Sequence, residues 1–344
     1  KLERALEVIA PPSAKILVLG FGSCIPALVA ARAGADVLWS EPVARLAEVA
    51  TELVRVNHLE RRCKVVNAKQ MAELSIRAHN FDVVITEGLG EEVLAERILN
   101  SARLARKTLL KPGGRFFPQR LRIFGAVATL RTKRTSGFDT RQFNVFRNTE
   151  GAVYDLECAM LNEPGCARLL SKPQLLLEFD LNNPPPEPLQ HTTCKLEAIA
   201  TVDGILNCIT WWPEIDLGGG TVLDFAPDTQ TPRHMYTRAI KQRINFIGYE
   251  RRLSPGDRVP LLLEYDDDSL SLSAPPQPAA LKSGEAVLWP QAPLLSYHFA
   301  MIAETVRNDC FERALVRAIA ACDAPPHVLD IGTGTGLLAM LAVR

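Results

Sequence analysis

The chain has 344 residues and a mass of 37.8 kDa, a length that suggests two or three domains. Its 39 basic and 39 acidic residues cancel, which argues against nonspecific binding to nucleic acid or to an anionic membrane. A composition of 47% hydrophobic and 23% charged residues excludes disorder as the main state. The apolar runs are far shorter than the roughly 20 residues of a membrane-spanning helix, so we expect a soluble protein with no membrane partner.

The cysteines indicate the cellular compartment. There are eight, with no C-x-x-C pair, no zinc-ligand spacing and no secretory leader. We therefore expect free thiols, no metal site and a reducing compartment, the cytoplasm or the nucleus or both.

The first 117 residues alternate between strand-like and helix-like patterns. Short apolar, β-branched runs cover residues 16–19, 36–40, 63–67 and 81–86. Residues 44–56, between the second and third runs, have helical periodicity. This alternation predicts a doubly wound parallel sheet. The turn at residues 110–115 then favours a methyltransferase-type sheet over a dehydrogenase-type sheet.

A glycine-containing turn follows the first of these runs. Gly20 and Gly22 lie where a parallel strand passes into a helix, a place where the backbone can approach NAD, a nucleotide or S-adenosylmethionine closely. Cys24 and Pro26 follow, and their extra Cβ and missing N–H are both unfavourable for tight binding. The alternative interpretation is a turn that no longer binds a ligand tightly.

An acidic residue follows the second run. Glu41 lies nineteen residues beyond Gly22, where a carboxylate can accept two hydrogen bonds from a ribose diol. The alternative is an ordinary solvated loop carboxylate.

Two glutamates follow the fourth run. Glu87 leaves that strand at its carboxyl end, and a glycine-containing loop then leads to Glu96. Two carboxylates converging at this edge could bind a guanidinium and cancel its charge. The alternative is that Glu91, Glu92 and Glu96 form a solvated helix face.

The pattern changes near Pro118. Runs at 123–127, 175–179, 205–212, 222–225, 244–247 and 259–265 are strand-like, with turns between them. They predict an all-β sandwich or barrel over residues 118–273. Because Phe116, Phe117 and Pro118 join the two regions without a flexible linker, we expect a packed interface between them. Residues 274–296 are predicted to be a linker.

The end of the chain repeats its beginning. Leu2 to Leu6 match residues 311–315 at an offset of 309, and Gly22 matches Gly332 at an offset of 310. A period of this length indicates a duplicated domain pair. Residues 297–344 are therefore predicted to begin a second sheet domain, whose turn is intact, with Asp330, Gly332, Gly334 and Gly336. Because the chain begins with Lys1 and ends within a helical pattern, we expect it to be an excised piece.

In combination, these motifs resemble the protein arginine methyltransferases. Residues 85–99 look like the double-glutamate loop of that family, with its nine-residue separation between Glu87 and Glu96. The β region is similar to the family's substrate barrel, and residues 170–180 are similar to the tandem-module members. Residues 297–307 resemble the family's N-terminal helices, in which His298, Met301 and Arg307 shape the cofactor site.

The resemblance implies a fold and a reaction. The fold is a methyltransferase sheet of the seven-stranded type, a β barrel, and the start of a second such sheet. The cofactor is S-adenosyl-L-methionine, and the substrate is an arginine side chain of a protein, oriented by Glu87 and Glu96. The second copy in the same chain is the expected partner.

Departures from the family, with Cys24 and Pro26 in the first glycine turn, keep two alternatives open. The first copy lacks the helices that should precede its sheet. Arg238, Ala239 and Ile240 stand where the family usually has Thr-His-Trp. The first copy could therefore be a non-catalytic module that completes the fold of an active second copy. The chain could also methylate another substrate, although its neutral charge and glutamate pair argue against RNA.

Overall fold

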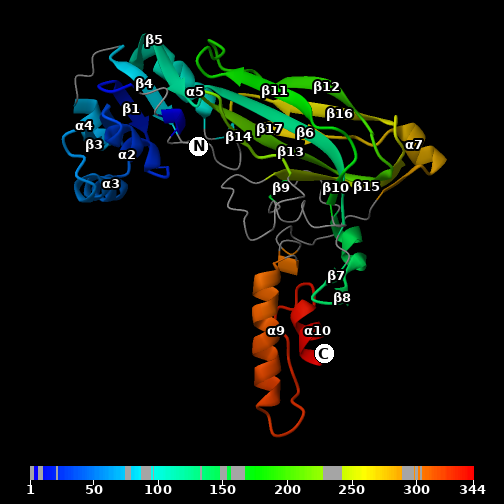
Figure 1. Cartoon of the computed structure of the whole chain (residues 1–344). Coiled ribbons are helices and arrows are strands. Elements are labelled where there is room, and N and C mark those ends of the chain that lie inside the picture. The colour runs from blue at the N-terminus through cyan, green and yellow to red at the C-terminus, as the bar shows by residue number, and fades with distance from the viewer. Residues whose placement is uncertain are drawn as a thin grey trace.

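The structure is a computed structural model of the whole chain. It describes residues 4–6, 11–20, 22–73, 79–86, 94–95, 97–131, 134–147, 153–155, 167–227, 242–288, 298, 301–302 and 304–344. Figure 1 shows three regions in chain order: a parallel sheet with helices, a group of long antiparallel strands, and a pair of helices that extends away from the rest.

The first region is a five-stranded parallel sheet in the order β3-β2-β1-β4-β5. Its strands are β1 (Lys15–Leu19), β2 (Asp36–Ser40), β3 (Cys63–Val66), β4 (Phe81–Thr86) and β5 (Leu110–Phe117). Its helical segments are α2 (Ile25–Arg32), α3 (Ala44–Val56), α4 (Ala68–Glu73), α5 (Ile98–Leu104) and the π-helical η1 (Ala105–Leu109). The prediction of a doubly wound parallel sheet is confirmed.

The described sheet has five strands and not the seven of the expected type. The chain leaves it at Phe117, the last residue of β5, and passes through Pro118 directly into the antiparallel region. No further strand of the described residues joins its edges.

Burial explains why these segments adopt their structures. In β4, Val83, Val84 and Ile85 are all buried, as expected for a strand covered on both faces. In α3, Ala47 and Ala50 are buried on one side of the helix, in keeping with the helical periodicity of that segment.

The second region contains two antiparallel sheets. The larger has eight strands: β6 (Arg120–Leu130), β9 (Val153–Asp155), β10 (Ala167–Leu169), β11 (Gln174–Asp180), β13 (Gly204–Gly218), β14 (Thr221–Asp224), β15 (Arg243–Leu253) and β18 (Ala286–Leu288). The smaller consists of β12 (Thr192–Ile199), β16 (Arg258–Tyr265) and β17 (Leu270–Ser273). The predicted antiparallel all-β region is therefore present.

Part of the predicted linker is folded. Residues 278–283 form the helix α7 (Pro278–Ser283), and β18 pairs with β15 in the larger sheet. Ala274 and Ala280 are buried. The antiparallel region therefore extends to Leu288, and the linker boundary at 274 is wrong, because the Pro- and Ala-rich composition of this segment concealed a strand that only pairing reveals.

The two regions share a packed interface. Phe116 N donates to Asn182 Oδ1 at 2.7 Å, and Asn182 Nδ2 donates back to the Phe116 carbonyl at 3.3 Å. Arg103 of α5 forms an ion pair with Asp267, in the turn between β16 and β17, and both side chains are largely buried. One continuous hydrophobic core includes residues of both regions. The expected interface is confirmed.

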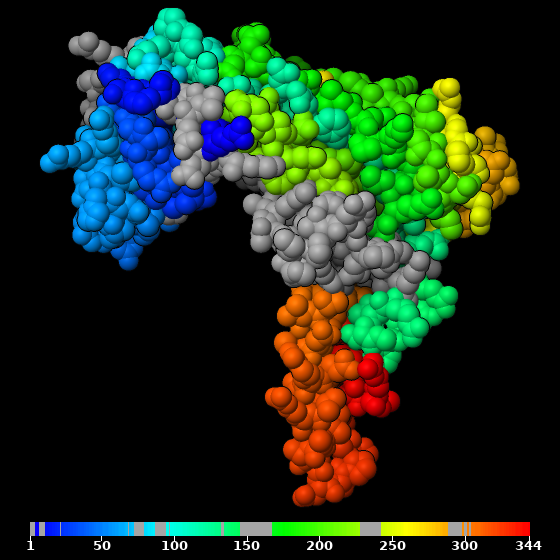
Figure 2. Space-filling model, viewed as in Figure 1, coloured from blue at the N-terminus to red at the C-terminus, as the bar shows by residue number. Residues whose placement is uncertain are grey.

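The third region is a pair of helices, α9 (Thr305–Ala320) and α10 (Leu337–Val343), that lie side by side (Figure 1). The space-filling view in Figure 2 shows them standing away from the two sheet regions, and among the described residues the segment around 134–147 lies beside them. That segment holds β7 (Arg134–Thr135), β8 (Phe138–Asp139) and the 3-10 helix η2 (Arg141–Arg147).

Residues 297–344 were predicted to begin a second sheet domain, but residues 328–331, at the glycine turn, form no strand. Val328, Leu329 and Ile331 are 53%, 83% and 86% exposed. A strand needs a neighbouring strand, and no described residue pairs with this segment. None of the helices in the described ranges is long and apolar enough to cross a bilayer.

Candidate functional site

The first glycine turn lies at the carboxyl end of β1. Gly20 and Gly22 have φ values of +81° and +45°, the left-handed region that glycine enters without steric cost. Gly20 N donates to the Ser40 carbonyl at 2.9 Å, and Trp39 Nε1 donates to the Gly20 carbonyl at 2.9 Å. The end of β2 therefore fixes the turn in place.

Cys24 occupies a backbone conformation that suits glycine. It precedes α2 as the N-cap residue with φ +59°, and its side chain makes no capping hydrogen bond. Pro26 lies in the first turn of α2, where backbone N–H groups have no partner within the helix, so the N–H that proline lacks is not needed there. Only Cys24, and not Pro26, is thus in a conformation unfavourable to its own residue type.

Glu41 is buried at the end of β2, with 2% of its surface exposed. Its Oε1 accepts from Val43 N at 2.8 Å, and Glu41 N donates to the Val66 carbonyl at 2.9 Å. The interpretation of Glu41 as a solvated loop carboxylate is wrong. Its position beside the turn at Gly20 is the one expected for a ribose-binding carboxylate.

The glutamate pair, Glu87 and Glu96, lies outside the described residues, and so does the loop around Ala239. The structure does place the strand that leads to the pair. Thr86 ends β4 and pairs in register with Leu19 at the end of β1. The polypeptide therefore enters the Glu87 loop at the same sheet edge as the Gly20 turn.

The second glycine turn has the same backbone character. Gly332, Gly334 and Gly336 have φ values of +75°, +53° and +75°, and Gly336 is the N-cap of α10. The imidazole of His298 lies against this turn, because a Cβ added at Gly334 would be 3.3 Å from His298 Cδ2. The structure thus brings together two of the predicted cofactor-binding residues.

Asp330 leaves a polar atom without a partner. Its Oδ2 is buried and accepts no hydrogen bond from the described residues. A buried carboxylate oxygen without a donor is costly, which fits a ligand donor at this turn.

The other two predicted residues of the second copy, Met301 and Arg307, contact residues of α9. Arg307 donates to Asn308 Oδ1 at 3.1 Å, and its guanidinium lies 4.7 Å from the centre of the Phe311 ring. Met301 is half-buried, and its carbonyl accepts a hydrogen bond from Asn308 Nδ2 at 3.3 Å. These contacts do not join Met301 or Arg307 to the glycine turn.

Sequence reasoning missed Asn308. It is fully buried, and its Nδ2 also donates to the Ile302 carbonyl at 2.9 Å, so it holds the segment before α9 against that helix. The signal available was an asparagine inside an otherwise helical pattern, which usually means that the side chain bonds to nearby backbone.

The described residues contain no group of three or more His, Cys, Asp or Glu side chains that could hold a metal ion. Six of the cysteines lie in the described ranges and are free. Burial raises the pKa of the Cys63 thiol to about 12, so this thiol is neutral at physiological pH.

The fold matches solved structures. The Trypanosoma brucei PRMT1 enzyme-prozyme complex with AdoHcy superimposes with a TM-score of 0.57 and 19% identity, over 76% of this chain and 82% of that chain. Arabidopsis thaliana protein arginine methyltransferase 10 gives a TM-score of 0.58 over the same shares, also at 19% identity. The described architecture is therefore the fold of this class of methyltransferase.

Curated proteins extend the comparison to sequence. The arginine N(omega)-methyltransferase of Streptomyces achromogenes subsp. streptozoticus is 30% identical over 237 residues, 66% of this chain and 63% of the relative. Protein arginine N-methyltransferase 6 of Danio rerio is 26% identical over 56% of this chain and 54% of its own length. Protein arginine N-methyltransferase 7 of Caenorhabditis briggsae is 23% identical over 76% of this chain and 41% of its own length.

No family model matches the chain. The chain spans about two fifths to three fifths of the length of these curated relatives. The resemblance seen in the sequence is confirmed: the chain is homologous to the protein arginine N-methyltransferases.

Proposed function

We propose that the protein containing this chain transfers a methyl group from S-adenosyl-L-methionine to a guanidino nitrogen of arginine in a protein substrate. The observation that carries the proposal is the burial of Glu41 beside the Gly20 turn, at the edge where β4 leads to Glu87. The similarity of the chain to arginine N-methyltransferases indicates the reaction that this arrangement would serve.

Both turns have features that fit the cofactor. In the first copy, Gly20, Gly22 and Glu41 would hold it. In the second copy, the unpartnered Asp330 Oδ2 is available as an acceptor, beside Gly332, Gly334 and Gly336. His298, Met301 and Arg307 complete the proposed second site. S-adenosylmethionine, when bound, supplies an electrophilic sulfonium methyl group.

The protein side chains orient the arginine. Glu87 and Glu96 would accept hydrogen bonds from the guanidinium and fix its plane, which exposes one nitrogen to the methyl group. Their negative charges stabilise the positive charge away from that nitrogen. Alignment and electrostatics then supply most of the acceleration, and no strong base is needed.

The tandem arrangement is part of the proposal. Residues 1–117 form the first methyltransferase domain, the two antiparallel sheets form a substrate barrel, and residues 297–344 begin a second methyltransferase domain. Arg344 supports a contact between the copies, because its guanidinium donates to the Ser136 carbonyl at 2.5 Å and lies 5.5 Å from the centre of the Phe138 ring. We assign the protein to the cytoplasm or nucleus, which suits its free thiols.

A second candidate function is a non-catalytic first copy. The left-handed backbone at Cys24 favours it, because a Cβ occupies the position where the second turn has Gly334. The solved Trypanosoma brucei complex pairs an enzyme with a prozyme, so a chain of this fold is found in an assembly of that kind. A different methyl acceptor is the third alternative, and the neutral charge of the chain makes RNA the least suitable of these.

Two experiments test these proposals. Titration calorimetry with S-adenosylhomocysteine measures binding to residues 1–344. We expect only weak binding, because the first turn has a sheet but carries Cys24, whereas the second turn has all its glycines but no described sheet beside it. A dissociation constant below the micromolar range, about 8 kcal/mol of binding free energy, would contradict this expectation.

The second experiment measures methylation of arginine peptides by the full-length protein carrying Glu87→Gln. A catalytic first copy loses at least one charge-assisted hydrogen bond, roughly 1.5 to 3 kcal/mol, and its activity falls at least about tenfold. Glu91→Gln is the matched control and leaves activity unchanged. Unchanged activity of Glu87→Gln, with normal thermal unfolding, would assign catalysis to the second copy.

A further inference from the structure

The acidic turn, residues 266–269, joins β16 to β17 and contains three consecutive aspartates. It belongs to the antiparallel region, whereas the proposed catalytic residue Glu96 belongs to the parallel-sheet region. Two arginines that follow Glu96 in the chain pair with this turn. The acidic turn therefore links the expected substrate barrel to the segment that carries Glu96.

Hydrogen bonds within the acidic turn fix its shape. Asp266 Oδ1 accepts from Asp268 N at 2.9 Å and from Ser269 N at 2.7 Å, and Asp266 N donates to the Ser269 carbonyl at 3.1 Å. The hydrogen bond from Asp268 N is the first of several interactions that lower the pKa of Asp266, so this carboxylate is charged at neutral pH. Asp266 thus serves its own turn, and Asp267 and Asp268 contact other segments.

These two aspartates each pair with an arginine at one end of α5. Asp267 pairs with Arg103 near the carboxyl end of the helix, and both side chains are largely buried. Asp267 Oδ1 also accepts from Leu189 N at 3.1 Å. Asp268 Oδ1 lies 3.5 Å from Nε of Arg97, which directly precedes the helix. The acidic turn therefore contacts α5 at both of its ends.

Arg97 has an unfavourable backbone conformation. Its φ of +58° lies in the left-handed region, which is strained for a residue with a Cβ. Its N donates to the Leu94 carbonyl at 2.8 Å, and Leu94 and Ile98 are both buried. A strained residue persists where the surrounding structure holds it, and Asp268 supplies a contact to the Arg97 side chain.

We propose that Asp268 and Arg97 are positioning residues for Glu96 in the proposed methyl transfer, on which this inference rests. Glu96 lies outside the described residues, but it is bonded to Arg97, so contacts that restrain Arg97 also restrict where the Glu96 backbone can lie. A carboxylate that orients a guanidinium must be held closely, because small displacements at a reacting site cost much of the rate. The antiparallel region thereby takes part in aligning the arginine substrate.

Amide hydrogen exchange in the full-length protein tests the restraint itself. Arg97 N and Ser101 N both donate within residues 94–104, so peptides that cover this segment report on how firmly it is held. Asp268→Asn removes one charge from a pair whose side chains are 68% and 51% exposed, so the fold stays intact. We expect this segment to exchange about two- to fivefold faster, the range that a partly exposed ion pair supports, and β1 to exchange at an unchanged rate.

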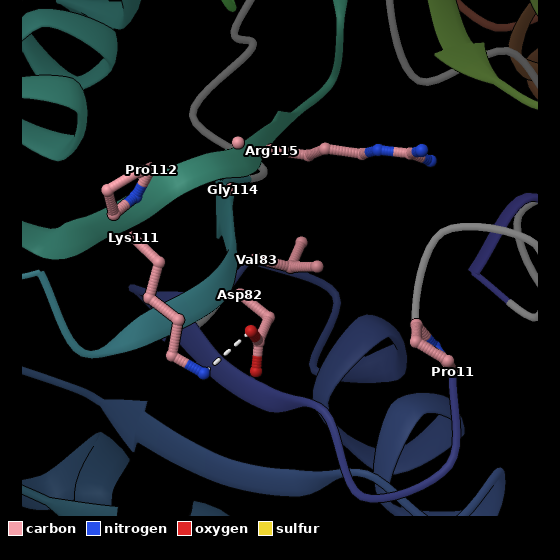
Figure 3. A pocket seen from close by; sticks show the side chains of 8 residues that line it. Pro11, Asp82, Val83, Lys111, Pro112, Gly114 and Arg115 are labelled. Carbon is pink, nitrogen blue, oxygen red and sulfur yellow. Dashed lines mark hydrogen bonds and ion pairs between the residues drawn. The ribbon is translucent and has the colours of Figure 1, made fainter.

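Lys111→Gln is the matched control. Lys111 Nζ and Asp82 Oδ1 form an ion pair at 2.7 Å near the amino ends of β5 and β4, as Figure 3 shows. These are the strand ends opposite to the one from which the chain enters the Glu87 loop. Removal of the Lys111 charge should therefore leave the exchange of residues 94–104 unchanged.

Methylation of an arginine peptide by the full-length protein tests the consequence for the reaction. We expect Asp268→Asn and Arg97→Gln each to lower kcat/KM about two- to fivefold, and the double variant to fall no further, because both changes break the same pair. The dissociation constant for S-adenosylhomocysteine and the thermal unfolding should stay unchanged, which distinguishes positioning from a general structural defect. Asp268→Glu keeps the carboxylate and should retain most of the activity.

Two kinds of failure are distinguishable. Unchanged exchange of residues 94–104 in Asp268→Asn would overturn the proposal. Unchanged kcat/KM in Asp268→Asn, in a protein that loses activity with Glu87→Gln, would overturn it as well, and so would additive losses in the double variant. Faster exchange in Asp268→Asn, with no effect of Glu87→Gln on activity, would support the restraint and contradict the proposed catalysis by the first copy.

Discussion

At the sequence offset of 310, Cys24 of the first glycine turn aligns with Gly334 of the second, and both have a left-handed backbone, with φ values of +59° and +53°. An L residue other than glycine is strained there by about 1 to 2 kcal/mol. The first turn therefore has the left-handed backbone of a glycine turn at a residue whose Cβ is strained in it.

We predict that Cys24→Gly stabilises the chain by about 1 kcal/mol, because relief of strain exceeds the extra entropy of glycine in the unfolded state. Urea unfolding measures the change. Ala33→Gly is the matched control at the other end of α2, where φ is −74°, and it should destabilise by roughly 0.5 to 1 kcal/mol. Destabilisation by both substitutions would show that the Cys24 side chain contributes more than the strain costs.

Glu41→Gln tests the proposed ribose site. Glutamine keeps the acceptor that bonds to Val43 N but loses the charge, so we expect S-adenosylhomocysteine to bind at least about tenfold more weakly to the full-length protein. Calorimetry with the cofactor product measures this. Glu48→Gln, which affects only an exposed pair with Arg45 on α3, should leave the affinity unchanged. Equal affinities for all three proteins would mean that Glu41 is purely structural.

The local elements of the fold could be predicted from sequence. The ranges expected for β2, β4 and α3 coincide with the structure, because each segment carries its own periodicity and its own boundary residues. The position of Glu41 at a strand end could be predicted for the same reason. Its burial could not, because burial depends on how β3 and the Gly20 turn pack around it.

Pairing between distant segments could not be predicted. Cys208 of β13 lies opposite Ala128 of β6, and nothing in either segment specifies that register. The same limitation explains why the linker boundary at 274 is wrong and why the expected second sheet has no described strand. Residues 286–288 form a strand because β15 is available, whereas residues 328–331 have strand-like composition without a described neighbour. Asp82 and Lys111 likewise meet only through the bulge in β5.

The interface between the two sheet regions yields a third prediction. Asp267→Asn removes the charge that pairs with Arg103, whose side chain is 11% exposed, and leaves a buried guanidinium unpaired. We expect a loss of about 3 kcal/mol in the free energy of unfolding. Asp268→Asn is the neighbouring control, because it pairs with Arg97 and both side chains are at least half exposed, so its cost should stay within about 0.5 kcal/mol. Similar costs for the two variants would show that the Arg103 pair does not secure the interface.

The last prediction concerns the thiols and pH. Burial raises the pKa of Cys63 to about 12 from an ordinary value of 9.0, so the folded chain keeps this proton while the unfolded chain releases it. The stability linked to Cys63 is therefore fully present below pH 9 and is lost progressively as pH rises from about 9 to about 12. Cys63→Ala, which creates a small cavity, should be less stable at pH 8 but should lose less stability over that alkaline range, as measured by urea unfolding at a series of pH values.

At pH 8 a thiol reagent should modify the exposed Cys310 and Cys322 at once and Cys63 only after denaturant is added. Rapid modification of Cys63 in the native chain would show that β3 opens far more readily than its packing indicates.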